Sequence, residues 1–286
     1  MTAVSDDLVF RHRLPLLVLV FAVSSSCKRK HVPVDQVPEL GYPACNHAAQ
    51  SADERVAVVA SGHLRSGPLS KEQSVVEHFQ LERTTCGFTL HSRQEWPLAI
   101  SDIEVRYDEE LKPLWAWKRM TVAGSTRADG NADVRRYELR TGEVFIKRRD
   151  PRGELTFEKL LPGGRMRVDQ AAMVGAVVGP GRGVITAWLR RAKLPVGGKV
   201  HELVLDFREM VETLEMAKLE RQPDLFEPTL NRTVRAYTFF GRETVFADEN
   251  DVVIGDLAGM RPSDTLSTPE PEPLPMYGGP DPVHTP

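Results

Sequence analysis

Hydrophobic and polar residues alternate with a period of two along most of the chain between residues 55 and 258. In the stretch SDIEVRYDEE, for example, Ile103, Val105 and Tyr107 alternate with charged neighbours. This alternation is typical of a β-strand that buries one face. Similar stretches follow one another with short connections, which favours antiparallel hairpins over crossover connections.

The alternation changes parity near Gly87. Phe79 and Leu81 lie on one parity, whereas Phe88 and Leu90 lie on the other. A turn or a bulge near Gly87 would reconcile the two patterns. Further turns are predicted where Gly, Pro or Asp interrupts the alternation, at Thr141-Gly142, 150–153, Gly241 and 248–251.

One segment departs from the β pattern. Residues 170–194 carry little charge before their end, and Gly179-Pro180-Gly181 excludes a continuous helix through them. The pattern predicts a short helix from about Val184 to Lys193. Its cations would lie at the C-terminal end, where they suit the helix dipole. The residues that it would bury are Val184, Ala187 and Trp188.

The sequence therefore predicts a mainly β protein. We expect a large twisted antiparallel sheet, curled as a half-barrel or an open barrel, with one inserted short helix. Either the sheet curls onto itself or the helical segment covers its concave side, because one face of such a sheet must be buried. The expected parts are a lipoprotein signal peptide (1–26), a tether (27–54), a β-rich domain with a helical insert (55–258, insert 170–194) and a disordered proline-rich tail (259–286).

The first residues predict export from the cytoplasm. Arg11 and Arg13 precede an apolar stretch, residues 14–23, that is followed by small residues. As a helix, this stretch would measure about 15 Å, half of the roughly 30 Å needed to cross a bilayer core. A basic region, a short apolar region and small residues together match a secretory signal peptide.

The end of this leader resembles a known processing motif. Ser24-Ser25-Ser26-Cys27 resembles the lipobox of bacterial lipoproteins, although Ser24 stands where Leu or Val is usual. The resemblance implies cleavage before Cys27, lipidation of its thiol with acyl chains such as palmitate, and anchoring to a membrane. Lys28 after the cysteine implies the periplasmic face of the outer membrane. Two alternatives are an ordinary cleaved signal peptide and a cytosolic protein with an apolar N-terminus.

The other two cysteines form an even pair if Cys27 is lipidated. Cys45 and Cys86 could then form a disulfide in an oxidising periplasm, worth about 4 kcal/mol on a loop-entropy model. Two free buried thiols are the first alternative. Metal binding through Cys45 and His47 is the second, although the paired ligands that zinc usually needs are missing.

Charge and motifs exclude several classes of function. The 37 basic and 40 acidic residues give no basic field for nucleic acid. The chain has no Gly-x-Ser-x-Gly elbow, and His63, His78 and His91 lack the spacing of paired metal ligands. The glycine-rich run at 179–183 lacks the Lys-Ser/Thr of a P-loop. We therefore expect no enzymatic activity, no metal and no cofactor.

Aromatic residues gather in two stretches, LWAWKRM (114–120) and AYTFFGRETVF (236–246). The first is apolar on both strand faces, so one face could line a pocket for an apolar ligand. The alternative is core packing, with the tryptophan rings against Arg and Lys side chains. The candidate pocket residues are Trp115, Trp117, Trp188, Tyr237 and Phe239.

The layout of residues 55–258 resembles the curved-sheet periplasmic proteins of the lipoprotein-carrier type, with a Pro-Val-Gly-Gly turn (195–198) before a second run of strands. This resemblance implies a concave apolar face. We therefore expect a non-enzymatic, lipid-anchored envelope protein that holds an apolar ligand, such as an acyl chain or a lipoprotein anchor, between the sheet and the helix. The alternative is a structural or interaction lipoprotein that presents a sheet edge or its proline-rich tail to an envelope partner.

Overall fold

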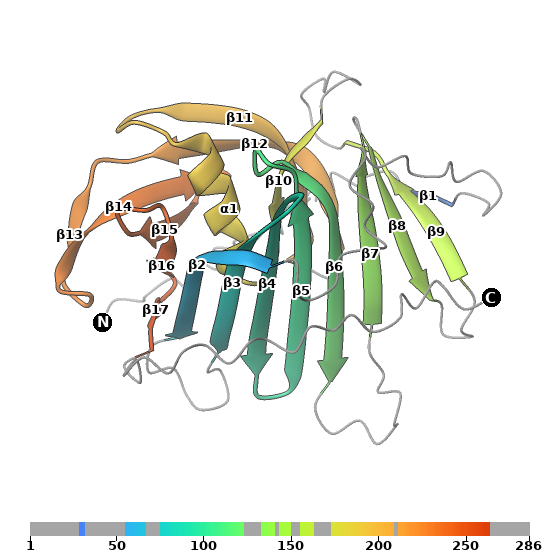
Figure 1. The fold of residues 1–286 in the computed structure, drawn as a ribbon, viewed down its shortest axis with the longest axis horizontal. Coiled ribbons are helices and arrows are strands. Elements are labelled where there is room, and N and C mark those ends of the chain that lie inside the picture. The colour runs from blue at the N-terminus through green and yellow to red at the C-terminus, as the bar shows by residue number, and fades with distance from the viewer. Residues whose placement is uncertain are drawn as a thin grey trace, which may run out of the picture.

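A computed structural model gives the architecture of the chain. Within its described residues the protein is mainly β, with one helix and a curled sheet that forms a half-barrel (Figure 1). This confirms the predicted fold class. The structure describes residues 29–31, 55–66, 75–122, 133–140, 143–149, 155–162, 173–208 and 211–263.

The larger sheet contains ten strands in the order β1-β9-β8-β7-β6-β5-β4-β3-β2-β17, and all neighbours are antiparallel. From β2 to β9 the order in space follows the order in sequence, so the predicted meander is confirmed. The strands are β1 (Arg29–His31), β2 (Arg55–Ser66), β3 (Val76–Thr84), β4 (Gly87–Trp96), β5 (Ala99–Tyr107), β6 (Pro113–Val122), β7 (Asp133–Arg140), β8 (Glu143–Arg149), β9 (Leu155–Leu160) and β17 (Met260–Pro262).

The predicted parity change lies at the β3–β4 hairpin. Thr85 and Cys86 form the turn between these strands, and Gly87 follows it with a φ of 129°. A side chain at Gly87 would overlap the carbonyl oxygen of Tyr107 on β5. The turn therefore needs glycine for its backbone conformation and for its close approach to the next strand.

The smaller sheet follows the order β10-β11-β12-β14-β15-β16, and β13 pairs with β14 beside this path. Its first two strands are parallel because α1 (Gly183–Ala192) connects them as a crossover, whereas the other pairs are antiparallel. The strands are β10 (Val174–Val178), β11 (Lys199–Asp206), β12 (Thr213–Arg221), β13 (Leu225–Glu227), β14 (Arg232–Phe239), β15 (Glu243–Ala247) and β16 (Val253–Asp256).

The helix α1 spans Gly183–Ala192, within a residue of the predicted bounds. It ends at Lys193, which is left-handed with a φ of 43° and donates its backbone N–H to the carbonyl of Leu189. The Pro-Val-Gly-Gly turn then reverses the chain. In this turn Gly198 donates to the carbonyl of Pro195, and Gly197 takes the positive φ that such a turn requires.

Two apolar layers meet at α1. One side of the helix, with Val184 and Ala187, packs in the core between the two sheets. The other side, with Ile185, Trp188 and Leu189, packs against the face of the smaller sheet that curls around it. The helix therefore lies inside the curl of the smaller sheet and touches β3 and β4 of the larger one (Figure 1).

Two short strands lie beyond the bounds expected for the β-rich domain. β1 falls in the expected tether and pairs with β9, and β17 falls in the expected tail and pairs with β2. The leader 1–26, Cys27, Cys45 and the tail from residue 264 lie outside the described residues. In the part of the chain that is described, no helix has the length and apolarity to cross a membrane.

Candidate functional site

The inner face of the larger sheet, which meets α1 and the smaller sheet, carries an apolar row beside a polar band. Across β3 to β8 the row consists of buried side chains that are cross-strand neighbours: Leu81, Leu90, Val105, Ala116, Tyr137 and Ile146. The polar band lies next to it and contains Glu77, Ser92, Gln94, Ser101, Lys118 and Arg135, all buried. Within this band Glu77, Lys118 and Arg135 bind groups outside the larger sheet. Gln94 Oε1 and Ser101 Oγ are buried without a hydrogen-bond partner among the described residues.

Glu77 on β3 caps the N-terminus of α1. Its carboxylate accepts the backbone N–H groups of Arg182 at 2.8 Å and Gly183 at 2.7 Å, and the Ser92 hydroxyl donates to it at 3.3 Å. The helix has no side-chain cap from its own first residues. Complete burial raises the pKa of Glu77, although these donors act in the opposite direction. Glu77, about a hundred positions earlier in the chain, therefore accepts N–H groups at the start of α1 that have no acceptor within the helix.

The glycines of the GPGRG run allow this close approach. A Cβ at Gly181 would lie 2.8 Å from a carboxylate oxygen of Glu77, and one at Gly183 would overlap the side chain of Phe79. At Gly179 a Cβ would lie 2.9 Å from the ring of Phe207. The run is a packing element that brings α1 against the larger sheet.

Arg182 links this buried cap to the surface. Its backbone N–H binds Glu77, whereas its side-chain Nε donates to Asp256 Oδ2 at 2.5 Å. Asp256 is buried at the end of β16, and its other oxygen accepts the backbone N–H of Met260 at 3.0 Å. Asp256 therefore holds the Arg182 guanidinium in a fixed orientation.

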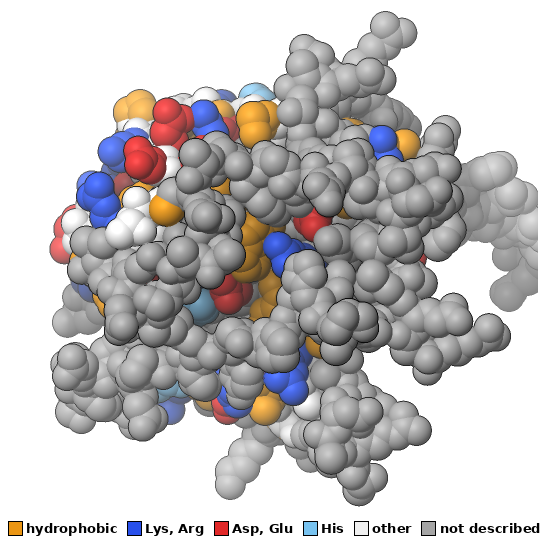
Figure 2. Space-filling view, turned by 45° about the vertical axis from the view of Figure 1, so that its right-hand side comes forward, with side chains coloured by type: hydrophobic (Ala, Val, Ile, Leu, Met, Phe, Trp, Pro, Cys, Tyr) orange, Lys and Arg blue, Asp and Glu red, His pale blue; other side chains and the backbone are white. Residues whose placement is uncertain are grey.

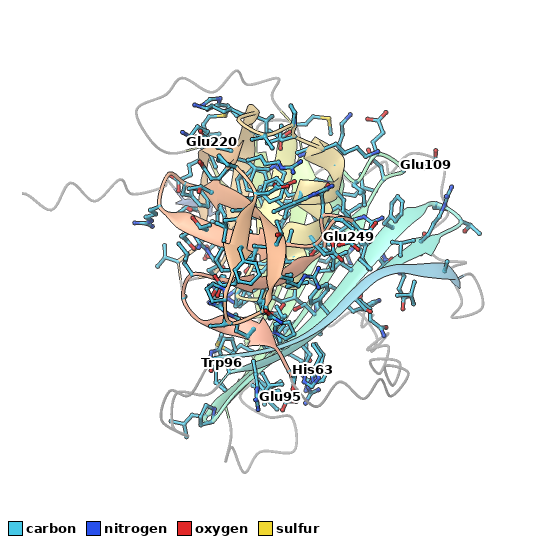
Figure 3. The ribbon with its side chains drawn as sticks, turned by 90° about the vertical axis from the view of Figure 1, so that its left-hand side faces the viewer. His63, Glu95, Trp96, Glu109, Glu220 and Glu249 are labelled. Atoms are coloured by element: carbon cyan, nitrogen blue, oxygen red, sulfur yellow. The ribbon has the colours of Figure 1, made fainter. Side chains whose placement is uncertain are left out.

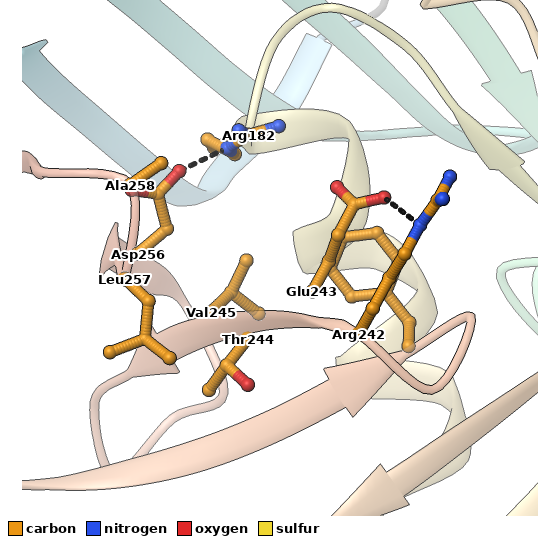
Figure 4. Close-up of a pocket in the computed structure, with 9 residues that line it drawn as sticks. Arg182, Arg242, Glu243, Thr244, Val245, Asp256, Leu257 and Ala258 are labelled. Atoms are coloured by element: carbon orange, nitrogen blue, oxygen red, sulfur yellow. Dashed lines mark hydrogen bonds and ion pairs between the residues drawn. The ribbon is translucent and has the colours of Figure 1, made fainter. Parts of the chain in front are cut away.

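A pocket opens beside this ion pair (Figure 4). Its volume is about 130 Å³, below the roughly 300–1,000 Å³ of a pocket that encloses a whole drug-sized ligand. Charged and apolar side chains share its walls, with Arg182 and Arg242 on two sides of Glu243 in Figure 4. The lining residues are Arg182, Phe239, Arg242, Glu243, Thr244, Val245, Asp256, Leu257 and Ala258.

Arg208 fixes the Glu243 side of the pocket. Its guanidinium binds both carboxylate oxygens of Asp206 and one oxygen of Glu243. The same guanidinium lies 5.7 Å from the ring centre of Phe239 and 5.3 Å from that of Phe240. The neighbouring carboxylates raise the pKa of Arg208 above its ordinary value despite burial, so Glu243 faces a permanent cation.

A second polar cluster joins the sheets away from the pocket. Glu212, in the segment before β12, accepts hydrogen bonds from Arg135 and from the Tyr137 hydroxyl on β7, the latter at 2.9 Å. Tyr137 stacks on Phe207 with ring centres 5.0 Å apart, and Lys118 donates to the Phe207 carbonyl at 2.9 Å. Burial alone would raise the pKa of Glu212, but these partners outweigh it and the pKa is lowered.

The structure brings together three of the five predicted pocket residues. Trp188, Tyr237 and Phe239 belong to one buried cluster around α1, with the Trp188 and Phe239 ring centres 6.4 Å apart. The Trp188 indole N–H donates to Glu202 at 2.7 Å. These side chains fill the space between the helix and the smaller sheet. Of the five, Phe239 alone lines the pocket described above.

The other two predicted pocket residues lie elsewhere. Trp115 and Trp117 on β6 alternate with the buried Ala116 and Lys118, so they point away from the inner face. Both are half-buried, and the Arg136 guanidinium lies 5.0 Å from the ring centre of Trp115. This contact matches the alternative of tryptophan rings packed against long basic side chains.

Cys86 is a disulfide-bonded cysteine in the β3–β4 turn. Cys27 and Cys45, the other cysteines of the chain, lie outside the described residues, so the Cys45–Cys86 pairing stays a prediction. The described residues contain no group of three or more His, Cys, Asp or Glu placed to hold a metal ion. On the face shown in Figure 2, acidic, basic and apolar side chains of the described residues are interspersed.

His63 and His78 form a stacked pair across β2 and β3, with ring centres 3.8 Å apart. Burial is the largest cause that lowers the pKa of each residue. At His63 the neighbouring His78 and Arg65 lower it further, whereas at His78 Glu95 acts in the opposite direction and Arg93 lowers it. His63 and Glu95 are labelled in Figure 3. The folded state therefore binds protons less readily than the unfolded chain. The contribution of this pair to the free energy of unfolding should be fully present above the unfolded pKa of about 6.5. It should decrease as the pH falls below that value.

The measurement is the thermal unfolding midpoint of the wild type and of His78→Gln between about pH 7.5 and about pH 5.5. We expect the midpoint of the wild type to fall more steeply with acidification, because the variant lacks one of the two stacked rings. Equal slopes in the two proteins would contradict this expectation.

The charged residues of the pocket were not predicted from the sequence. Arg182 lies in the glycine-rich run, which lacks the Lys-Ser/Thr of a P-loop. Glu243 and Asp256 lie in segments whose pattern predicts strands and indicates no binding site. Lys118 interrupts the apolar parity of LWAWKRM and proves to be buried, but it belongs to the second polar cluster and not to the pocket. Nothing in the spacing indicates that residues 182, 243 and 256 meet.

No protein-family model matches the sequence, and the search of curated proteins found no match. Among solved structures, the chain is similar to the crystal structure of a DUF1089 family protein from Pseudomonas aeruginosa. That similarity covers 69% of this chain and 95% of the other, at 14% sequence identity and a TM-score of 0.41.

Proposed function

We propose that the protein is a non-enzymatic, lipid-anchored protein of the cell envelope that binds an amphipathic ligand such as a lipid. The leader pattern and Cys27 support the address, on the periplasmic face of the outer membrane. The pocket beside α1 supports the binding role, because charged groups and apolar side chains line the same small opening.

The ligand is placed at the pocket and not between the helix and the sheet. Buried side chains, among them Trp188 and Tyr237, already fill the latter space. The pocket volume of about 130 Å³ suits the polar head of a lipid and leaves its chains outside. At the rim, Leu257 is 67% exposed and offers an apolar surface on which such chains can lie.

Filling the pocket should abolish lipid binding. In Ala258→Trp an indole replaces a methyl group at the pocket wall, in an exposed turn where the change leaves the core intact. The measurement is native mass spectrometry of the full chain in detergent, incubated with lipids extracted from a bacterial envelope. We expect lipid adducts on the wild type and a loss of at least about tenfold in the variant, equivalent to about 1.4 kcal/mol.

Leu98→Trp is the matched control. Leu98 is 74% exposed in the β4–β5 turn, so the same bulky residue is added at a site outside the pocket. Its adducts should equal those of the wild type. Equal adducts on Ala258→Trp and wild type would overturn the assignment of the pocket, and a wild type without adducts would overturn lipid binding.

The second candidate is a structural or interaction lipoprotein that uses a sheet edge. Among the described strands β13 pairs with β14 alone, and it carries Phe226, which is 58% exposed. An apolar edge strand of this kind can pair with another chain. Phe226→Lys separates the two functions, because it should weaken an edge contact and leave lipid adducts unchanged.

A further inference from the structure

The pocket beside α1 offers hydrogen-bond donors but few acceptors that lack a partner. Asp256 receives Arg182 on one oxygen and the Met260 N–H on the other. Glu243 is bound by Arg208, and its second oxygen lies 3.9 Å from Arg242 Nε. A cationic ligand would therefore have to displace an arginine from a carboxylate.

The arginines have donors to spare. Arg182 uses Nε for Asp256, and its two terminal nitrogens make no hydrogen bond within the described part of the chain. The Arg242 side chain makes no hydrogen bond to any described residue, and it is 80% exposed. An anion can bind these terminal N–H groups without breaking a contact that the protein already has.

The two arginines differ in how firmly they are held. Arg182 is 19% exposed and is fixed by the buried carboxylate of Asp256, so its terminal fork is preorganised. Arg242 is far more exposed, so its side chain can adjust to a ligand. The backbone N–H groups of Arg182 and Gly183 at the start of α1 are not available to a ligand here, because Glu77 already receives them.

We propose that this pocket binds a phosphate group, held by the guanidinium groups of Arg182 and Arg242. Guanidinium forks match the oxygen geometry of phosphate and make strong charge-assisted hydrogen bonds with it. This inference rests on the proposed function, since the phosphate is then the head group of the bound lipid. It deepens that function by excluding neutral and purely cationic head groups as the preferred ligands.

The size of the pocket agrees with this ligand. A cavity of about 150 Å³ accommodates benzene, so about 130 Å³ has room for a compact tetrahedral group. The apolar part of the wall, formed by Val245 and Leu257, lies beside the charged part and suits the carbon atoms next to the phosphate. A phosphate on a lipid and a free phosphomonoester share this chemistry, so the experiment must separate the two sources.

The experiment measures affinity for four probes with the full chain in detergent micelles. The soluble probes are glycerol 3-phosphate and glycerol, and the micellar probes are phosphatidylglycerol and diacylglycerol. We expect both phosphate-bearing probes to bind more tightly than their neutral counterparts, and the difference to shrink as salt is raised. Arg242→Gln should weaken binding of the phosphate probes about tenfold, because one charge-assisted contact of about 1.4 kcal/mol or more is lost.

Arg232→Gln is the matched control. Arg232 is also a surface arginine paired with a glutamate, 45% exposed and 3.5 Å from Glu249, and it does not line the pocket. It should bind all four probes with the affinity of the wild type.

Arg182→Lys is the second test variant. It keeps a cation beside Asp256 but loses the two terminal nitrogens of the guanidinium. The difference in affinity between phosphate-bearing and neutral probes should therefore be smaller than in the wild type.

The outcomes separate the two proposals. Binding of phosphatidylglycerol without glycerol 3-phosphate identifies a lipid head group, and binding of both identifies the phosphate itself. If diacylglycerol binds as tightly as phosphatidylglycerol and Arg242→Gln changes nothing, the phosphate inference is overturned while lipid binding stands. If neither lipid binds, the proposed function fails. If glycerol 3-phosphate still binds in that case, and Arg242→Gln weakens its binding, the pocket is a phosphate site that does not take lipids.

Discussion

Replacing Glu77 with alanine should lower the free energy of unfolding by about 3–5 kcal/mol, measured by urea denaturation near neutral pH. The substitution leaves the backbone N–H groups of Arg182 and Gly183 without their acceptor at a buried helix end. It also removes the acceptor of the Ser92 hydroxyl and opens a cavity under the GPGRG run. Because α1 has no other side-chain cap, no neighbour takes over this role.

Two further variants make this prediction specific. Glu77→Gln keeps the volume and one acceptor oxygen, so it should cost about 1–2 kcal/mol. Glu95→Ala on the adjacent strand removes a carboxylate that is 47% exposed and paired with Arg93, and it should cost less than about 0.5 kcal/mol. A Glu77→Ala protein as stable as Glu95→Ala would show that the helix does not depend on the cap.

The pH dependence of the Glu77 contribution has a definite sign. Burial raises the pKa of this carboxyl, so the folded state holds its proton to a higher pH than the unfolded chain does. The contribution is therefore fully present below the unfolded pKa of about 4.3 and is reduced as the pH rises toward the folded value. Glu77→Gln, which cannot ionise, should lack this dependence.

Replacing Glu212 with alanine should lower the free energy of unfolding by a similar amount, about 3–5 kcal/mol. Glu212 is fully buried, and its loss leaves the Arg135 guanidinium and the Tyr137 hydroxyl inside the molecule without this acceptor. The cost arises mainly from the charge that remains, because a buried pair itself contributes little net stability. Urea denaturation at neutral pH measures it directly.

The controls test this explanation. Glu249→Ala removes a carboxylate that is 77% exposed and should cost less than about 0.5 kcal/mol. The double variant Arg135→Leu and Glu212→Leu should be more stable than Glu212→Ala, since neither buried charge remains in it. If the double variant is the less stable of the two, the remaining charge is not the source of the loss.

The Glu212 contribution should respond to acid in the opposite sense to that of Glu77. Arg135 and Tyr137 outweigh burial and lower the pKa of Glu212, so the folded state favours the ionised form. The contribution is fully present above the unfolded pKa of about 4.3 and is lost as the pH falls through the folded value. This range lies below the one in which the His63–His78 pair titrates, so the two effects can be separated.

Local patterns were sufficient for most of the elements. The alternation in β5, the parity change at Gly87 and the short helix at 183–192 each depend on neighbours within a few residues, and each was predicted. The parallel pairing of β10 with β11 was not, because it depends on how α1 packs and not on either strand's own sequence.

The candidate site could not be predicted in the same way. Aromatic residues were predicted to line a pocket, yet Trp188 and Tyr237 belong to the hydrophobic core, and Trp115 points to the other face of its sheet. The charged pocket residues come from three separate segments, at Arg182, Glu243 and Asp256. The spacing of these residues in the sequence does not indicate that they lie close together, because the curl of the smaller sheet brings them to the same pocket.

A mainly β protein with one short helix follows from the residue pattern alone, since strand and helix periods are local properties of the chain. The pattern also sets the position of that helix through the glycines before it and the Pro-Val-Gly-Gly turn after it. The cap that Glu77 provides for the helix, and the contact of Arg182 with Asp256 at an open pocket, depend on the packing of the whole chain. Both contacts join residues far apart in the chain, so they form only when the two sheets pack around α1.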